Sequence, residues 1–125
     1  MIVTKATGLA RFYHATRYSM KGIRAAYINE PAFRYEAWAA LVMLPGAFWI
    51  AQSALQLSLM ISALLLVLIM ELLNTAIEAV VDRAGTEFNT LAGLAKDLGS
   101  AAVLFSLLIT ALIWGGIIYD NFFSG

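Results

Sequence analysis

Residues 37–70, AWAALVMLPGAFWIAQSALQLSLMISALLLVLIM, contain no charged side chain and decide the fold class. A membrane-spanning helix needs about 20 apolar residues at 1.5 Å rise per residue, so this block is too long for a single span. Four polar side chains interrupt it: Gln52, Ser53, Gln56 and Ser58. The block therefore predicts two spans joined by a tight turn, at about residues 34–51 and 57–83. Pro45 is compatible with the first span because a membrane helix tolerates a local kink.

Outward from this block, the stretch Leu98–Tyr119 is also free of charge and predicts a third span at about residues 98–119. Between the two blocks, the second span continues past Glu71 and Glu78 to about Arg83. We therefore expect an all-α integral membrane protein with three transmembrane helices.

The composition of the 125 residues points the same way: 62% are hydrophobic, 13% are charged and the mean hydropathy is +0.81. Soluble domains carry roughly 25% charged and about 45–50% apolar residues. A chain this short cannot bury such an excess of apolar surface within itself, so we expect one membrane domain, residues 1–125, whose surplus faces lipid. The net charge of zero gives no reason to expect a nucleic-acid partner. The absence of cysteine excludes disulfides and thiolate chemistry.

The positions of the charges predict the orientation. Residues 1–36 carry six basic and two acidic side chains, and residues 71–97 carry two basic and five acidic ones. The turn near residues 52–57 and the tail after Tyr119 carry no basic residue. Because basic loops stay on the cytoplasmic side, the amino terminus and a loop at 84–97 are expected to be cytoplasmic and the carboxyl terminus periplasmic.

Residues 8–28, ahead of the first span, alternate basic with apolar or aromatic side chains. This pattern is typical of an amphipathic surface helix that lies on anionic headgroups. A second interpretation is that some of these cations meet a phosphate-bearing ligand.

The stretch Glu71–Asp82, ELLNTAIEAVVD, carries the candidate chemistry. Spacings of three and four residues place Glu71, Asn74, Glu78 and Asp82 on one helical face. Carboxylate and amide oxygens suit Mg²⁺, which often shares its coordination shell with substrate phosphates, and one carboxylate could instead remain free as a general base. Alternatively, these groups pair with basic side chains of a neighbouring helix and only set its register.

Lys96 and Asp97 stand at the foot of the third span. They could cap that helix, with Lys96 extending toward the interface, or hold a phosphate and its counter-charge. No Walker-type or dinucleotide-binding glycine loop is present in the sequence.

Four segments resemble the prokaryotic diacylglycerol kinase family: Tyr18–Glu30 (YSMKGIRAAYINE), Ala32–Arg34 (AFR), Glu71–Arg83 (ELLNTAIEAVVDR) and Ala95–Val103 (AKDLGSAAV). The resemblance covers residues 8 to 119. It implies a homotrimeric inner-membrane lipid kinase with three spans and an amino-terminal surface helix per subunit. Such an enzyme transfers the γ-phosphate of MgATP to diacylglycerol and forms phosphatidate, with sites shared between neighbouring subunits.

The resemblance also implies residue roles. Glu71 matches the catalytic base and Asn74 the amide beside it, and Glu30 and Glu78 match the carboxylates that hold Mg²⁺. Positions implied to contact ATP are Arg11, Tyr18, Glu30, Glu78, Glu87, Lys96 and Asp97. Positions implied to contact the lipid substrate are Arg11, Ala15, Ser19, Arg24, Ala26, Ala32, Phe33, Arg34, Glu36, Trp49, Glu71, Ser100 and Trp114. Phe88 and Asn89 depart from the family's pattern and receive no role.

Two alternatives to a diacylglycerol kinase remain at this stage. An undecaprenol kinase of the same family shares the acidic motif. A small proton-coupled exporter would use a membrane carboxylate such as Glu71 for proton exchange, but it has no use for Lys96 and Asp97 together with Glu30 and Glu78.

Overall fold

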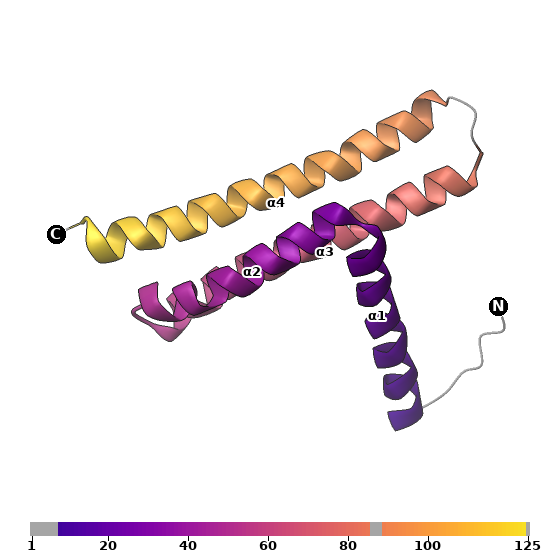
Figure 1. The fold of residues 1–125 in the computed structure, drawn as a ribbon. Helices are drawn as coiled ribbons and strands as arrows, with labels where there is room; N and C mark the ends of the chain where they lie inside the picture. Colours follow the sequence, from indigo (N-terminus) through magenta and orange to yellow (C-terminus); the bar gives the residue numbers. More distant parts are fainter. Residues whose placement is uncertain (1–7, 86–88, 125) are drawn as a thin grey trace.

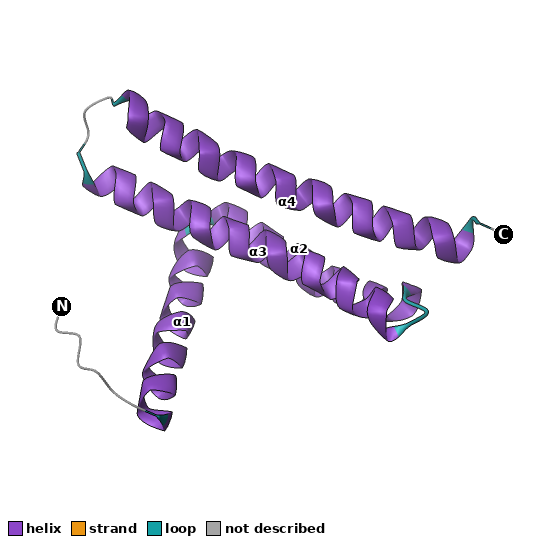
Figure 2. Cartoon of the chain, turned by 180° about the vertical axis from the view of Figure 1, so that it is seen from behind, coloured by secondary structure: helices purple, strands orange, loops and turns teal. Residues whose placement is uncertain are grey.

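The computed structural model describes residues 8–85 and 89–124, which form four helices: α1 (Leu9–Asn29), α2 (Pro31–Ile50), α3 (Ala54–Arg83) and α4 (Thr90–Phe122). Helix α3 packs against both α2 and α4, and these three run alongside one another (Figure 1). Helix α1 turns away from them, which the reverse view also shows (Figure 2). The expected all-helical architecture is confirmed.

Two of the described helices, α3 and α4, are long and apolar enough to span a membrane. Helix α2 has 20 residues but does not reach this hydropathy, because it carries Arg34 and Glu36 in its first turns and Pro45 within it.

Two helices begin earlier than the sequence predicted. Helix α3 starts at Ala54 because Ser53, expected to lie in the turn, accepts a hydrogen bond from the backbone N–H of Gln56 and caps the helix. Helix α4 starts at Thr90 rather than near residue 98, because Asn89 Oδ1 accepts from the backbone N–H groups of Leu91 and Ala92. The expected loop at 84–97 is therefore wrong for residues 90–97, which are helical.

The buried core joins α3 and α4 and reaches α2. Its buried members are Ala47, Met60, Ala63, Leu64, Trp114 and Ile117. Two side chains of α4 donate to backbone carbonyls of α3: Trp114 Nε1 to Met60 O at 3.1 Å, and Thr110 Oγ1 to Ala63 O at 3.2 Å. Such bonds satisfy polar groups where lipid offers no partner, so they favour close helix packing.

A polar clasp, formed by Gln56, Asn121 and the carbonyl of Ile50, closes the bundle at the α2–α3 turn. Asn121 Nδ2 donates to Ile50 O at 2.8 Å and to Gln56 Oε1 at 2.9 Å, and Gln56 Nε2 donates to Asn121 Oδ1 at 3.1 Å. The clasp ties α2, α3 and α4 together at one end. The opposite end of the bundle carries the acidic motif.

The corner between α1 and α2 is held by Arg34. The chain turns at Glu30, which is extended, and Pro31 starts α2. Arg34 Nη1 donates to the carbonyls of Tyr27 at 2.8 Å and Ile28 at 3.2 Å, which have no helical partner at the end of α1. Trp38 Nε1 adds a bond to the Tyr27 hydroxyl at 2.9 Å. Arg34, a predicted substrate contact, thus has a structural role in this chain.

Candidate active site

The acidic motif lies on the part of α3 that faces both α4 and the α1–α2 corner. Glu71 is buried, with 7% of its surface exposed, while Asn74 and Glu78 are half-buried. Asn74 Nδ2 donates to Glu78 Oε1 at 3.1 Å, so the amide fixes one oxygen of that carboxylate. The motif therefore divides into an enclosed carboxylate and a more accessible, oriented one.

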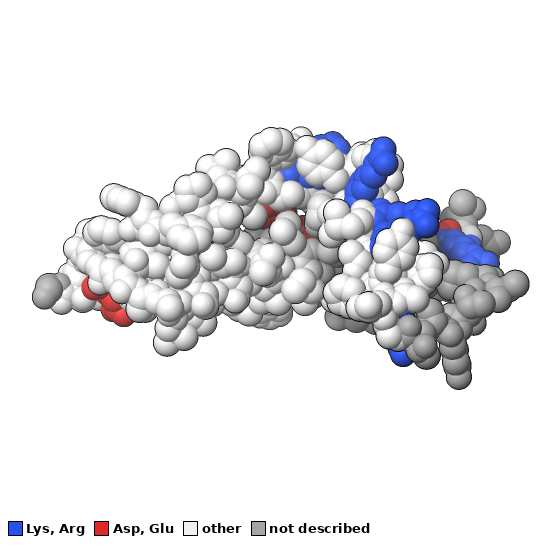
Figure 3. Space-filling view, turned by 90° about the horizontal axis from the view of Figure 1, so that it is seen from below, with Lys and Arg blue, Asp and Glu red and all other residues white. Residues whose placement is uncertain are grey.

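Glu71 shares this region of the molecule with carboxylates from two other segments. The negative charges of Glu30, Glu36 and Glu78 all act on the Glu71 carboxylate. Helix α3 contributes Glu71 and Glu78, helix α2 contributes Glu36, and the corner contributes Glu30. Seen from below, acidic side chains lie in a hollow of the molecule with basic side chains to one side of it (Figure 3). This arrangement concentrates negative charge that a cation or a proton would relieve.

These donors fit a divalent cation only in part. Within residues 8–85 and 89–124, no group of three Asp, Glu, His or Cys side chains is placed to hold a metal ion. Glu30 and Glu78 offer hard oxygen ligands, so the rest of the coordination shell would come from water and phosphate oxygens. Mg²⁺ is commonly bound in this way, through one or two carboxylates plus substrate phosphates.

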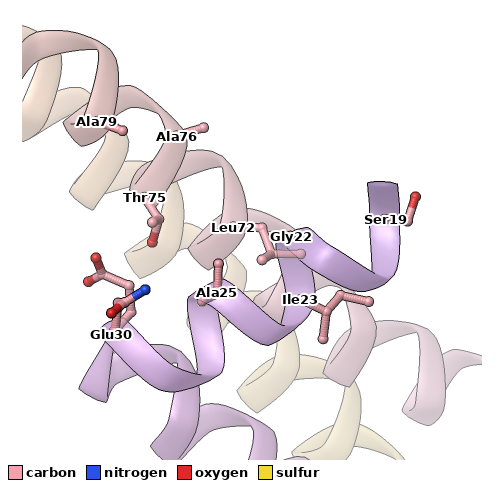
Figure 4. Close-up of a pocket in the computed structure, with 11 residues that line it drawn as sticks. Ser19, Gly22, Ile23, Ala25, Glu30, Leu72, Thr75, Ala76 and Ala79 are labelled. Carbon is pink, nitrogen blue, oxygen red and sulfur yellow. The ribbon is translucent and has the colours of Figure 1, made fainter. Parts of the chain in front are cut away.

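A cavity of about 540 Å³ lies between α1 and α3, and Glu30 is among the residues that line it. Small side chains on both helices leave this space, among them Gly22 and Ala25 on α1 and Ala76 on α3. Figure 4 shows Glu30 and Thr75 extending toward one another at one side of it. The cavity is thus mostly apolar with polar side chains at one side, which suits a molecule that has an apolar part and a polar part. Sequence reasoning missed Thr75, whose only signal is its place directly after Asn74.

Lys96 forms an ion pair with Asp82 rather than with its neighbour Asp97. Lys96 Nζ lies 2.7 Å from Asp82 Oδ1, and both side chains are substantially exposed. The pair joins α4 to α3 one turn beyond Glu78. Lys96 therefore lies next to the acidic motif of α3, and sequence reasoning missed Asp82 as its partner.

Among the other predicted residues, Ser19 and Ala26 line the cavity, whereas Trp114 and Trp49 lie away from the acidic motif. Trp114 packs at Met60, eleven residues from Glu71, or about 16 Å along α3. Trp49 is exposed near the clasp, where it stacks on Phe122 at 5.9 Å. Ala26 and Phe33 are buried at the corner. Exposed positions on α1 are Arg11, Ala15, Tyr18, Ser19 and Arg24, and Ala32 and Ser100 are exposed on α2 and α4. Glu87 and Phe88 lie outside the described residues.

Comparison with known proteins connects this arrangement to a family. The family model described as prokaryotic diacylglycerol kinase matches residues 17–118. This range includes the four glutamates discussed above: Glu30, Glu36, Glu71 and Glu78. The chain belongs to this family. The resemblance predicted from the sequence is thereby confirmed.

Curated relatives match nearly the whole chain. The diacylglycerol kinase of Haemophilus influenzae is 46% identical over 115 residues, covering 92% of this chain and 98% of the relative. That of Escherichia coli (strain K12) is 46% identical over 121 residues, covering 97% and 99%. That of Pseudomonas aeruginosa is 45% identical over 112 residues, covering 90% and 91%. Membership identifies the chain as an enzyme of the kinase class, and its apolar helices identify it as a membrane protein.

Proposed function

We propose that this chain transfers the γ-phosphate of ATP to the free hydroxyl of diacylglycerol and releases phosphatidate and ADP. The observation that carries the proposal is the buried Glu71 carboxylate, which lies on the same helix, α3, as the Asn74–Glu78 hydrogen bond. Family membership supports the same reaction.

Glu71 is the general base of the proposed reaction. Its carboxylate takes the proton of the lipid hydroxyl as that oxygen bonds to the γ-phosphorus, and the bond from the γ-phosphorus to the bridging oxygen of ADP breaks. Because Glu71 is buried on a membrane-spanning helix, its carboxylate is suited to a hydroxyl that arrives from the membrane. Asn74 positions Glu78 through its hydrogen bond.

Glu30 and Glu78 are the proposed ligands of Mg²⁺, which when bound would neutralise phosphate charge. The proposed ATP contacts are Arg11, Tyr18, Glu87, Lys96 and Asp97, with Lys96 leaving Asp82 for a phosphate. Among the proposed lipid contacts, Ser19 and Ala26 line the cavity beside Glu30. Trp49 and Trp114 are distant enough from it to meet only acyl chains. Arg34 contributes by keeping the corner in place.

We further propose three spans, with α2 as the first, and α1 as a surface helix on the cytoplasmic side of a bacterial inner membrane. Helix α2 is 20 residues long, which is sufficient to cross the hydrocarbon core. We also propose the homotrimer that the family resemblance implies. Sites shared between neighbouring subunits would add metal and nucleotide ligands to those of one chain.

The test uses purified protein, radiolabelled ATP and mixed micelles of either diacylglycerol or undecaprenol. We expect the label to enter phosphatidate. Label that enters only undecaprenyl phosphate would assign the chain to the other branch of the family. Failure to label either lipid, together with proton flux in reconstituted vesicles, would favour the exporter.

A further inference from the structure

Gly99 on α4 is in contact with the Asn74 amide on α3. Gly99 is buried, and a Cβ atom built on it would collide with Asn74 Oδ1 and would lie 3.3 Å from Asn74 Cγ. It would also meet Ile77 Cδ1 at 3.5 Å. At Gly93, on the same helix, a Cβ atom meets no other atom within 4 Å. A side chain at residue 99 therefore forces the Asn74 amide to move, whereas one at residue 93 displaces no other atom.

The contact with Gly99 restricts the side-chain amide of Asn74, which makes a single hydrogen bond among the described residues. Asn74 Nδ2 donates to Glu78 Oε1, but Asn74 Oδ1 is buried and accepts no hydrogen bond from the residues that the structure describes. The backbone of α4 at Gly99 is what limits the rotation of the amide on that side. Glu78 is in turn oriented by Asn74, so one chain of contacts runs from Gly99 to the carboxylate.

We propose that Gly99 is a positioning residue of the phosphoryl-transfer site, which acts through Asn74 to orient the Glu78 carboxylate. The proposal rests on the proposed function and deepens it. A Cβ at residue 99 displaces the nearest movable atoms, which belong to the Asn74 amide. The amide then leaves Glu78, whose carboxylate no longer presents a fixed oxygen to the cation and phosphates.

Helix propensity allows this effect to be separated from a general effect on folding. Alanine is a better helix former than glycine, so Gly99→Ala and Gly93→Ala both gain the same local stability. They differ in the contacts of the added Cβ at residue 99, of which the one with Ile77 is an ordinary van der Waals contact and only the one with Asn74 is a collision. Gly93→Ala is therefore the matched control.

The first experiment measures turnover and Mg²⁺ dependence on diacylglycerol for the wild type and both variants. We expect Gly99→Ala to lower kcat by about 10²-fold, the cost of a small misplacement at a reacting centre, and to raise the Mg²⁺ concentration for half-maximal rate. Gly93→Ala should stay within about twofold of the wild type in both quantities. Equal behaviour of the two variants would overturn the proposal, as would a lower kcat with unchanged Mg²⁺ dependence.

The second experiment does not require turnover. It measures the affinity of the wild type, Gly99→Ala, Asn74→Ala and the double variant for a non-hydrolysable ATP analogue with Mg²⁺. If Gly99 acts through Asn74, the double variant binds no more weakly than Asn74→Ala, because the group that Gly99 positions is already absent. Losses that multiply would show that Gly99 acts independently of Asn74 and would overturn the proposal.

The two experiments separate this proposal from the proposed function. If the wild type does not phosphorylate diacylglycerol, the proposed function fails, and the binding measurements still decide the role of Gly99. If the wild type is active while Gly99→Ala matches Gly93→Ala, the role of Gly99 fails alone. A wild type that binds no MgATP analogue overturns both.

Discussion

The ammonium group of Lys96 lies 2.7 Å from the carboxylate of Asp82, and this ion pair joins α4 to α3 one turn beyond Glu78. Both side chains are substantially exposed, so water and salt weaken their attraction. A triphosphate carries more charge than Asp82 and would compete with it for Lys96 at the proposed nucleotide site. The pair thus keeps the lysine near the acidic cluster without holding it firmly.

Replacement of Asp82 by asparagine should lower the half-saturating ATP concentration by about twofold, because Lys96 no longer has to leave a carboxylate. Steady-state kinetics at low and high salt check this, and the difference from the wild type should shrink as salt rises. Lys96→Gln is the opposing variant and should weaken ATP use. An increase in the half-saturating ATP concentration for Asp82→Asn would show that Asp82 positions Lys96 rather than competes for it.

Replacement of Glu71 by glutamine should abolish nearly all phosphate transfer while nucleotide binding remains. Glutamine keeps the shape of the side chain but cannot accept the proton, and general-base catalysis contributes about 10²–10⁴ in rate. Turnover with diacylglycerol and binding of a non-hydrolysable ATP analogue measure the two effects. If the folded variant loses less than about tenfold in turnover, proton abstraction by Glu71 does not limit the reaction.

Replacement of Glu30 or Glu78 by glutamine should raise the Mg²⁺ concentration needed for half-maximal rate. The amide keeps the size of each side chain and removes the charge that attracts the cation. Asp120→Asn serves as the control, because Asp120 is an acidic residue near the clasp, at the opposite end of α4 from Lys96. Unchanged Mg²⁺ dependence in both glutamate variants would remove them from the metal site.

Replacement of Asn121 by alanine should destabilise the fold and spare the chemistry. The side chain makes three hydrogen bonds that connect α2, α3 and α4, and an unpaired partly buried polar group costs about 1–3 kcal/mol. Thermal unfolding in micelles should occur at a lower temperature, with kcat unchanged below the transition. Ser124→Ala, which removes an exposed bond within the same helix end, should leave the unfolding temperature unaltered.

A reporter fused after Gly125 should be found on the periplasmic side. Three spans place the two ends of the chain on opposite sides, and the basic residues keep the amino terminus inside. A reporter sensitive to compartment, expressed in cells, measures this directly. A cytoplasmic tail would mean an even number of spans, which would remove α2 from the membrane.

The sequence predicted the helical class because long uncharged stretches have few other solutions in lipid. It placed Glu71, Asn74 and Glu78 on one helical face from spacing alone, and the Asn74–Glu78 bond joins two of them as that spacing implies. What spacing cannot supply is the contact between elements. The Lys96–Asp82 pair crosses from α4 to α3, and the Arg34 bonds link α2 to α1, so both depend on tertiary geometry. The sequence prediction placed the start of α4 too late, because it took the charged residues 96 and 97 as part of a loop. Asparagine is a common helix N-cap, so Asn89 was the local signal for the observed start at Thr90.

The clasp also determines where the chain tolerates modification. Asn121 is the last described residue that hydrogen-bonds to another helix, and Phe122 after it stacks on Trp49 of α2. The described bond beyond them, from Ser124 to Asp120, stays at the end of α4. Purification tags attached after Gly125 therefore leave the connection between the three helices intact. Truncation from Asn121 onward removes that connection, so a shortened chain would lose cohesion at the end of the bundle remote from the acidic motif.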